Sequence, residues 1–268
     1  MQVTAELIEQ ARSGDARALE ALARHAQTRV YPLAVRMLGD PDPAQDATQE
    51  ILIRVVTKLS SFRGESRFDT WVYRVATNYL LTAKKVRARD PRLTFDVFGA
   101  DLETGLVDDL QASAEDHVML NELRIRCTMA MLLCLDRDHR VAYVLGEIME
   151  MSQSEATAVL DVSPDTYRKR LSRARADVQA FTARSCGLAA KDAACRCSRR
   201  LPTAMAMGRV PAEPSAHFAD APTYGEVRVQ AAQTEARLVA AKLQRATGPL
   251  MSTEDIARHV MRLVDPPG

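Results

Sequence analysis

The chain has 268 residues, and at about 150 residues per domain this length suggests two domains. Apolar residues make up 47% and charged residues 26%, which excludes a wholly disordered chain and a fibrous repeat. Only 11 Gly and 12 Pro are present, so the composition favours helices over a turn-rich sheet sandwich. The predicted fold class is all-α.

The N-terminal segment, the lack of long apolar runs and the number of cysteines indicate where in the cell the protein acts. No apolar run reaches the roughly 20 residues of a membrane helix, and the start, MQVTAELIEQARSGD, does not have the pattern of a signal peptide. We therefore expect a cytoplasmic protein with no membrane partner. Its five cysteines are an odd number, which argues against a disulfide framework and favours free thiols or a metal.

Charge is unevenly distributed, although the net charge is only +1. Residues 54–92 hold ten basic residues against three acids, and residues 168–184 hold six basic residues against one acid. Between them, residues 95–116 contain seven acids and no Lys or Arg, a pattern typical of a solvated linker. The sequence predicts two basic modules joined by an acidic linker.

The first module begins with a helical pattern. Apolar residues three and four apart predict two helices before Gly39, and the segment DPDPAQDATQE predicts a turn followed by a third helix to about Ser60. Asp46, Gln49 and Glu50 fall on the flanking or outward faces of this third helix. A polar face of this kind suggests a surface for a partner.

A further helix, continuing to about Arg87, carries aromatic residues beside cations. Trp71 and Tyr79 share one side, while Arg74, Asn78 and Lys85 share another. Single-stranded nucleic acid suits such a surface, because unstacked bases need aromatic rings and the backbone needs positive charge. The alternative is an aromatic core side with a solvated cationic face.

The second module ends in a helix-turn-helix pattern, after helices expected over about 122–135 and 137–149. Ser152 and Glu155 form an S-x-x-E capping box, and Ser163 followed by Pro164 begins the next helix. That helix places apolar residues on one side and cations on the others, as a recognition helix in the major groove does. The expected buried residues are Tyr167, Leu171, Ala174, Val178 and Phe181.

Both modules resemble parts of one protein family. The segment DPDPAQDATQEILIRVVTKLSSFRGESRFDTWVYRVATNYLLTAKK resembles region 2 of bacterial sigma-70-type factors, and RDHRVAYVLGEIMEMSQSEATAVLDVSPDTYRKRLSRARADV is similar to their region 4. Two small helical domains with a flexible linker resemble the extracytoplasmic-function (ECF) group. The resemblance gives four parts: region 2 over 1–92, an acidic linker over 93–116, region 4 over 117–184, and an extension over 185–268.

The resemblance implies a transcription initiation subunit that binds core RNA polymerase, directs it to promoter DNA and catalyses nothing. Asp46, Gln49 and Glu50 would dock on the polymerase, and the loop over residues 62–69 would capture a flipped base of the minus-ten element. The linker would follow the RNA exit path, unless it is an ordinary tether. The expected minus-ten contacts are Phe62, Arg63, Phe68, Trp71, Arg74, Asn78, Lys84 and Lys85. The expected minus-thirty-five contacts are Ser163, Asp165, Thr166, Arg168, Lys169, Ser172 and Arg173.

The extension carries three clustered thiols, Cys186, Cys195 and Cys197. Three interpretations stay open: a zinc site, redox-sensitive thiols activated by nearby cations, and inert packing thiols. The fourth zinc ligand would be His217, the nearest downstream histidine, or else Cys127, Cys134 or a residue of a second chain. No cofactor is required by the sigma-factor interpretation itself.

Beyond the thiols, helices are expected over about 226–246 and 253–264. This tail resembles C-terminal extensions that regulate some ECF-type factors in place of a separate anti-sigma protein. Control by an anti-sigma factor, self-regulation by the extension, and a helical hairpin that merely stabilises region 4 are the alternatives.

Two other functions fit parts of the pattern. One is a stand-alone helix-turn-helix regulator that binds duplex DNA as a dimer and never contacts polymerase. The other is a metalloenzyme built on the thiols, but the sequence lacks the His and Glu partners and Gly-rich loops that such chemistry usually needs. We rank the metalloenzyme last.

Overall fold

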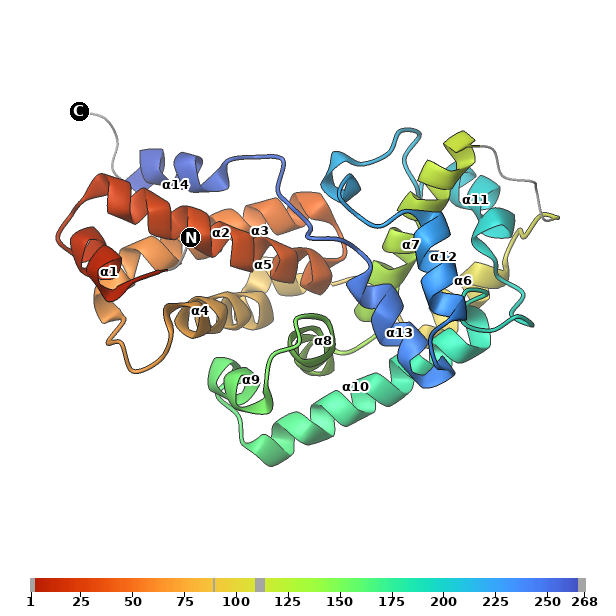
Figure 1. Cartoon of the computed structure of the whole chain (residues 1–268), viewed down its shortest axis with the longest axis horizontal. Helices are drawn as coiled ribbons and strands as arrows, with labels where there is room; N and C mark the ends of the chain where they lie inside the picture. Colours follow the sequence, from red (N-terminus) through yellow and green to blue (C-terminus); the bar gives the residue numbers. More distant parts are fainter. Residues whose placement is uncertain (1–2, 89, 109–113, 265–268) are drawn as a thin grey trace. The chain divides into compact units, whose positions relative to one another are not determined.

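The computed structural model describes residues 3–88, 90–108 and 114–264, with side chains for all of these except 114–116. The described chain forms two compact units (Figure 1). Unit 1 comprises residues 1–90, 152–164 and 251–268, and unit 2 comprises residues 91–151 and 165–250. All regular structure in the described residues is helical, which confirms the all-α prediction.

Unit 1 is a bundle around α2. Gly39 adopts a left-handed conformation (φ 75°) that ends α2, and Asp40 then caps α3, which begins with Pro41. The helix α2 packs against α1, α3 and α4, and side chains such as Leu22 and Ile51 are fully buried between them. The elements are α1 (Ala5–Arg12), α2 (Ala16–Leu38), α3 (Pro41–Thr57), η1 (Leu59–Ser61), α4 (Phe68–Thr82) and α5 (Lys84–Ala88).

Two helices from distant parts of the sequence complete unit 1. The helix α9 (Gln153–Leu160) packs against α4, and α14 (Ile256–Val264) packs against α2 and α3. Figure 1 shows α14 and α4 on opposite sides of α2. The bundle therefore has one face covered by the C-terminal helix and another covered by the first helix of the helix-turn-helix segment.

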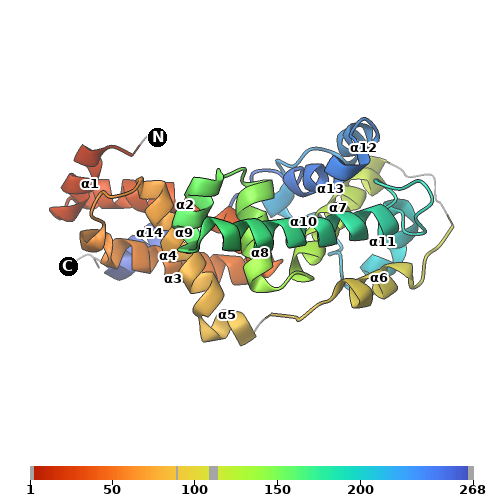
Figure 2. The same ribbon diagram turned by 90° about the horizontal axis from the view of Figure 1, so that it is seen from below.

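Unit 2 is arranged around α7. This helix packs against α6, α11, α12 and α13, while α10 runs as one long helix (Figure 2). The helices predicted over 122–135 and 137–149 are confirmed, although α7 begins earlier and the second ends in a π-helical turn, η2. The elements are α6 (Phe95–Glu103), α7 (Ala114–Leu133), α8 (Arg137–Tyr143), η2 (Val144–Ile148), α10 (Pro164–Ser185), α11 (Cys197–Ala206), η3 (Ala216–Phe218), α12 (Tyr224–Ala232) and α13 (Ala236–Arg245).

The predicted acidic linker is more ordered than expected. Residues 95–103 form α6, whose Phe98 is buried and stacks on Phe181 with ring centroids 5.4 Å apart. Asp101 accepts hydrogen bonds from Arg200 and Arg209, each at 2.9 Å. Apolar packing and ion pairing thus replace solvation in this part of the segment. Residues 109–113 of the predicted linker lie outside the described residues.

The extension divides between the two units. The predicted helix over 226–246 is wrong as a single element, because α12 ends near Gln233 and α13 starts at Ala236. Residues before 251 pack on α7, where the buried Arg124 donates to the carbonyl of Ala246 at 2.8 Å. This part of the extension therefore stabilises unit 2. No helix in the described ranges is long and apolar enough to cross a membrane.

Candidate nucleic-acid interface

Three aromatic rings form a cluster where α4 begins. The Phe62 ring packs edge-on against Phe68 at 5.7 Å between centroids, and the Trp71 ring lies 5.5 Å from Phe62 and 5.8 Å from Phe68. Phe62 and Phe68 are each only 5% exposed, whereas Trp71 is half-buried. The two phenylalanines are therefore buried and support the loop from inside, while their contact with minus-ten DNA stays a prediction. Trp71 is the most exposed residue of the three.

The start of α4 is tied to α2 by an ionic contact. Asp69 Oδ1 lies 2.6 Å from His25 Nε2, and Asp69 Oδ2 accepts a hydrogen bond from Arg29 at 3.3 Å. The hydrogen bond from His25, aided by the positive charges of both partners, lowers the pKa of Asp69 against the opposing effect of burial. Sequence patterns missed His25 and Arg29, because the residues lie 44 and 40 positions from Asp69.

The polar side of α4 is exposed at Arg74 and Asn78. The Arg74 guanidinium donates to the carbonyl of Ala158 on α9 through Nε at 3.0 Å and through Nη2 at 2.5 Å. Arg63 and Lys84 are exposed, while Lys85 pairs with Glu50 at 3.3 Å. The predicted minus-ten residues thus form an aromatic group beside a cationic surface, part of which α9 engages in this structure.

The polar residues of α3 differ in their surroundings. Asp46 is exposed and Gln49 is half-buried. Glu50 accepts from Arg54 at 2.8 Å as well as from Lys85, and the hydrogen bond from Arg54 is the largest cause of its lowered pKa. Glu50 is therefore held by Arg54 and Lys85, and Asp46 is the most exposed of the three side chains.

The first helix of the helix-turn-helix segment has the predicted capping box. Ser152 Oγ accepts from the backbone of Glu155 at 3.3 Å, and the Glu155 carboxylate accepts from the backbone of Ser152 at 3.1 Å. Asp161 ends α9 in a left-handed conformation (φ 53°), and α10 begins at Pro164. The predicted capping box is confirmed.

The helix α10 separates an apolar side from a polar side. Tyr167, Ala174, Val178 and Phe181 are buried as predicted, and Leu171 is half-buried. The predicted contacts to DNA lie on its other sides or just before it. Exposed among them are Ser163, Asp165, Arg168, Lys169, Ser172 and Arg173, with Thr166 half-buried.

Ion pairs distinguish the cations of α10. Arg170 pairs with Asp138 at 2.8 Å, and Arg175 donates to Glu147 at 3.1 Å through Nε. Arg168 pairs with Asp165 one helical turn away. Within the described residues, neither Lys169 nor Arg173 has an ion pair or hydrogen bond through its side chain. These two cations are the ones most available to phosphates or bases.

The clustered thiols do not form a metal site in the described residues. Each of the three thiols borders an apolar cluster: Cys195 packs with Phe98 and Phe181, Cys197 packs near Leu120, and Cys186 packs near Val227. The three thiols also lie near enough to one another and to Cys127 to interact electrostatically. Burial raises the pKa of Cys195 to about 11 and that of Cys197 to about 12. His217 is half-buried in η3. Burial outweighs the effect of nearby cations on the pKa of the Cys195 and Cys197 thiols. The zinc, redox and packing interpretations stay predictions.

Comparisons with known proteins match the first module and, through whole relatives, 63% of the chain. Residues 22–90 match the family model described as Sigma-70 region 2. The RNA polymerase sigma-H factor of Pseudomonas aeruginosa is 33% identical over 173 residues, which cover 63% of this chain and 89% of that protein. The ECF RNA polymerase sigma factor SigW of Bacillus subtilis is 33% identical over 173 residues, covering 63% of this chain and 90% of its own.

Two further comparisons have similar coverage. The ECF RNA polymerase sigma-E factor of Escherichia coli is 32% identical over 174 residues, covering 63% of this chain and 88% of its own. A solved structure of CnrH in complex with the cytosolic domain of CnrY is 26% identical with a TM-score of 0.46, covering 65% of this chain and 94% of that one. Taken with the paired helical modules, the sequence relatives show that this chain belongs to the ECF group of sigma-70-type RNA polymerase sigma factors, which act in transcription initiation.

Proposed function

We propose that this sigma factor uses three separate surfaces to bind core polymerase, the minus-ten element and the minus-thirty-five element. Asp46 and Gln49 on α3 contact core polymerase, and Arg54 fixes the carboxylate of Glu50 beside them through a hydrogen bond. Trp71, Arg63, Arg74, Asn78 and the lysines of α5 act on the opened minus-ten element. The exposed side of α10 contacts the minus-thirty-five element. Phe62 and Phe68 hold the minus-ten loop in shape from within.

The exposed side of α10 is the observation that carries this proposal. Lys169, Ser172 and Arg173 lie within two helical turns and are exposed, while Tyr167 and Ala174 of the same helix are buried. A helix with this division can enter a major groove without disturbing its own core. Flipping a minus-ten base costs a few kcal/mol of stacking, and Trp71 with the nearby cations offers contacts that offset it.

Reconstitution tests the function directly. Purified full-length protein is added to core RNA polymerase on genomic promoter DNA, and specific transcripts are expected to start from a defined set of promoters. The relatives are named RNA polymerase sigma factors, which favours this outcome over a stand-alone duplex-binding regulator. A protein that gives no transcript until another sigma factor is added would support the regulator instead. Control by an anti-sigma factor stays a prediction.

A further inference from the structure

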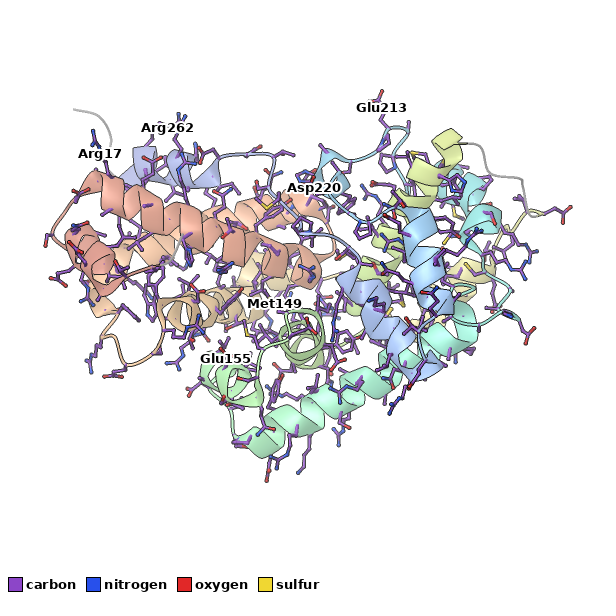
Figure 3. All side chains as sticks on the ribbon, viewed as in Figure 1. Arg17, Met149, Glu155, Glu213, Asp220 and Arg262 are labelled. Atoms are coloured by element: carbon purple, nitrogen blue, oxygen red, sulfur yellow. The ribbon has the colours of Figure 1, made fainter. Side chains whose placement is uncertain are left out.

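The C-terminal helix α14 is the feature that the proposed function does not use. It is amphipathic and buries Ile256, Ala257 and Val260 against α2 and α3. Val260 is 0% exposed, whereas Leu263 on the same helix is 55% exposed. Figure 3 shows Arg262 pointing away from the bundle. The helix therefore docks through one defined face.

Specific polar contacts hold the start of α14. The Gln27 amide donates to the carbonyl of Glu254 at 2.9 Å and accepts from the backbone of Ala257 at 2.8 Å. Arg24 pairs with Asp255 at 2.7 Å. Gln27 thus satisfies a backbone group that a helix start leaves without an intrahelical partner. Apolar burial alone would not fix the helix in this position.

The docked helix lies beside the face of α3 that we assign to polymerase. Asp42, Gln45, Asp46 and Gln49 of α3 line a cavity of about 200 Å³, whose other walls are residues of the C-terminal segment. Those residues are Glu254, Ile256 and His259. Arg258 and Arg262 of the helix are exposed, and Glu254 faces the cavity together with Asp42 and Asp46. Apolar burial and the contacts of Gln27 and Arg24, rather than charge attraction to α3, therefore hold the segment in place. Any partner that covers Asp46 and Gln49 must share this space with the C-terminal segment.

Two features of the packing of α14 favour its release from the bundle. Gln45 Oε1 is buried without a hydrogen-bond partner among the described residues, which weakens the docked state. An isolated helix of nine residues is not stable in water, so α14 unfolds once it leaves the bundle and gains conformational entropy. The docking of α14 on unit 1 is therefore specific, but the unsatisfied Gln45 oxygen and the lost conformational entropy both oppose it.

We propose that α14 masks the polymerase-binding face of α3 in the free protein, so that the C-terminal helix and core polymerase compete for unit 1. This inference rests on the proposed role of Asp46 and Gln49. It assigns the regulation of that surface to a named segment of the same chain, and it makes release of residues 256–264 a step in assembly with polymerase.

Full-length variants and their affinity for core polymerase test the proposal. Val260→Asp places a charge in the buried face and is expected to tighten binding at least tenfold. The matched control Leu263→Asp adds the same charge on the exposed face and should stay within twofold of the parent protein. Hydrogen exchange of residues 256–264 should accelerate in Val260→Asp only. Accelerated exchange with unchanged affinity would overturn the proposal.

A second pair of variants covers the case in which Val260→Asp fails to fold. Arg24→Glu breaks the contact with Asp255 and should tighten binding about threefold, and adding Asp255→Arg should restore the parent affinity. No gain from Arg24→Glu, or no restoration, counts against masking. Asp46→Arg in the Val260→Asp background separates the two proposals. Weakened binding there supports the α3 face whatever α14 does, whereas unchanged binding rejects the face itself.

Discussion

His25 on α2 and Asp69 in the first turn of α4 are joined by a contact of 2.6 Å between Nε2 and Oδ1. Because the pKa of Asp69 is lowered in the folded protein, its ionised form stabilises the fold at pH values above its unfolded pKa. That stability is lost as the pH falls through the folded pKa. The temperature at the midpoint of thermal unfolding should therefore decrease at pH values below about 4.

The variant Asp69→Asn removes this dependence. It should be less stable than the parent at pH 6 but should lose less of its thermal midpoint between pH 5 and pH 2.5. Circular dichroism melts across this range provide the measurement. Glu6→Gln, on the exposed surface of α1, is the control and should follow the parent curve. An unchanged pH profile in Asp69→Asn would contradict the assignment.

The capping box of α9 gives a second prediction. Ser152→Ala removes the acceptor for the Glu155 backbone and should destabilise the fold by about 1 kcal/mol, while Ser152→Thr should retain most of the stability. Gln153→Ala, which changes an exposed residue at the start of the same helix, is the control. Denaturant melts measure the change, and equal stability of the Ala and Thr variants would argue against the cap.

Two basic residues should differ in how they affect promoters. Lys84→Ala should weaken promoter complexes by a similar factor across sequences and reduce their salt dependence, as expected for a phosphate contact. Arg173→Ala should act selectively on promoters that differ in the upstream element, with about 1 to 3 kcal/mol of lost discrimination if it contacts a base. Binding titrations at several salt concentrations measure both effects. Equal effects of the two variants at every promoter would defeat these assignments.

Gly146 and Tyr167 provide a test of packing in unit 2. A Cβ on Gly146 would lie 2.5 Å from Tyr167 Oη, which is itself buried with no hydrogen-bond partner among the described residues. Gly146→Ala should cost about 1 to 3 kcal/mol through overpacking, whereas Tyr167→Phe should be nearly neutral. The double variant should recover part of the loss. Additive effects in a double-mutant cycle would show that the two sites do not touch.

The thiols should be slow to react in the native protein. Burial raises the pKa of Cys195 to about 11 and of Cys197 to about 12, so little thiolate exists at pH 8. Reaction with a disulfide reagent at pH 8 should be slow before unfolding, and all five thiols should react rapidly in denaturant. A rapid native phase assigned to Cys195 or Cys197 would instead support the redox interpretation.

Local patterns predicted the elements whose determinants lie within a few residues. Ser152 and Glu155 predicted the start of α9, and the apolar spacing of Tyr167, Ala174 and Phe181 predicted the buried side of α10. These features follow from backbone hydrogen bonding and helical periodicity alone. They needed no knowledge of what packs against them.

Long-range packing explains what the sequence did not predict. Acidic neighbours concealed the apolar spacing of Phe98 and Leu102 in α6, whose partner Phe181 lies far along the chain. The amphipathic pattern of 253–264 predicted a helix but not its partners Arg24 and Gln27. Likewise, aromatic spacing could not distinguish the buried Phe68 from the half-buried Trp71 three residues later.

The length of α10 has a mechanical consequence. Its 22 residues span about 33 Å, with the cations proposed for DNA near one end and Phe181, stacked on Phe98, near the other. A tilt of about 5° at the aromatic end displaces the opposite end by about 3 Å, which is as long as a hydrogen bond. Under the proposed role of α10 in DNA binding, changes in the side chains around Phe181 should therefore alter promoter choice without any direct contact to DNA.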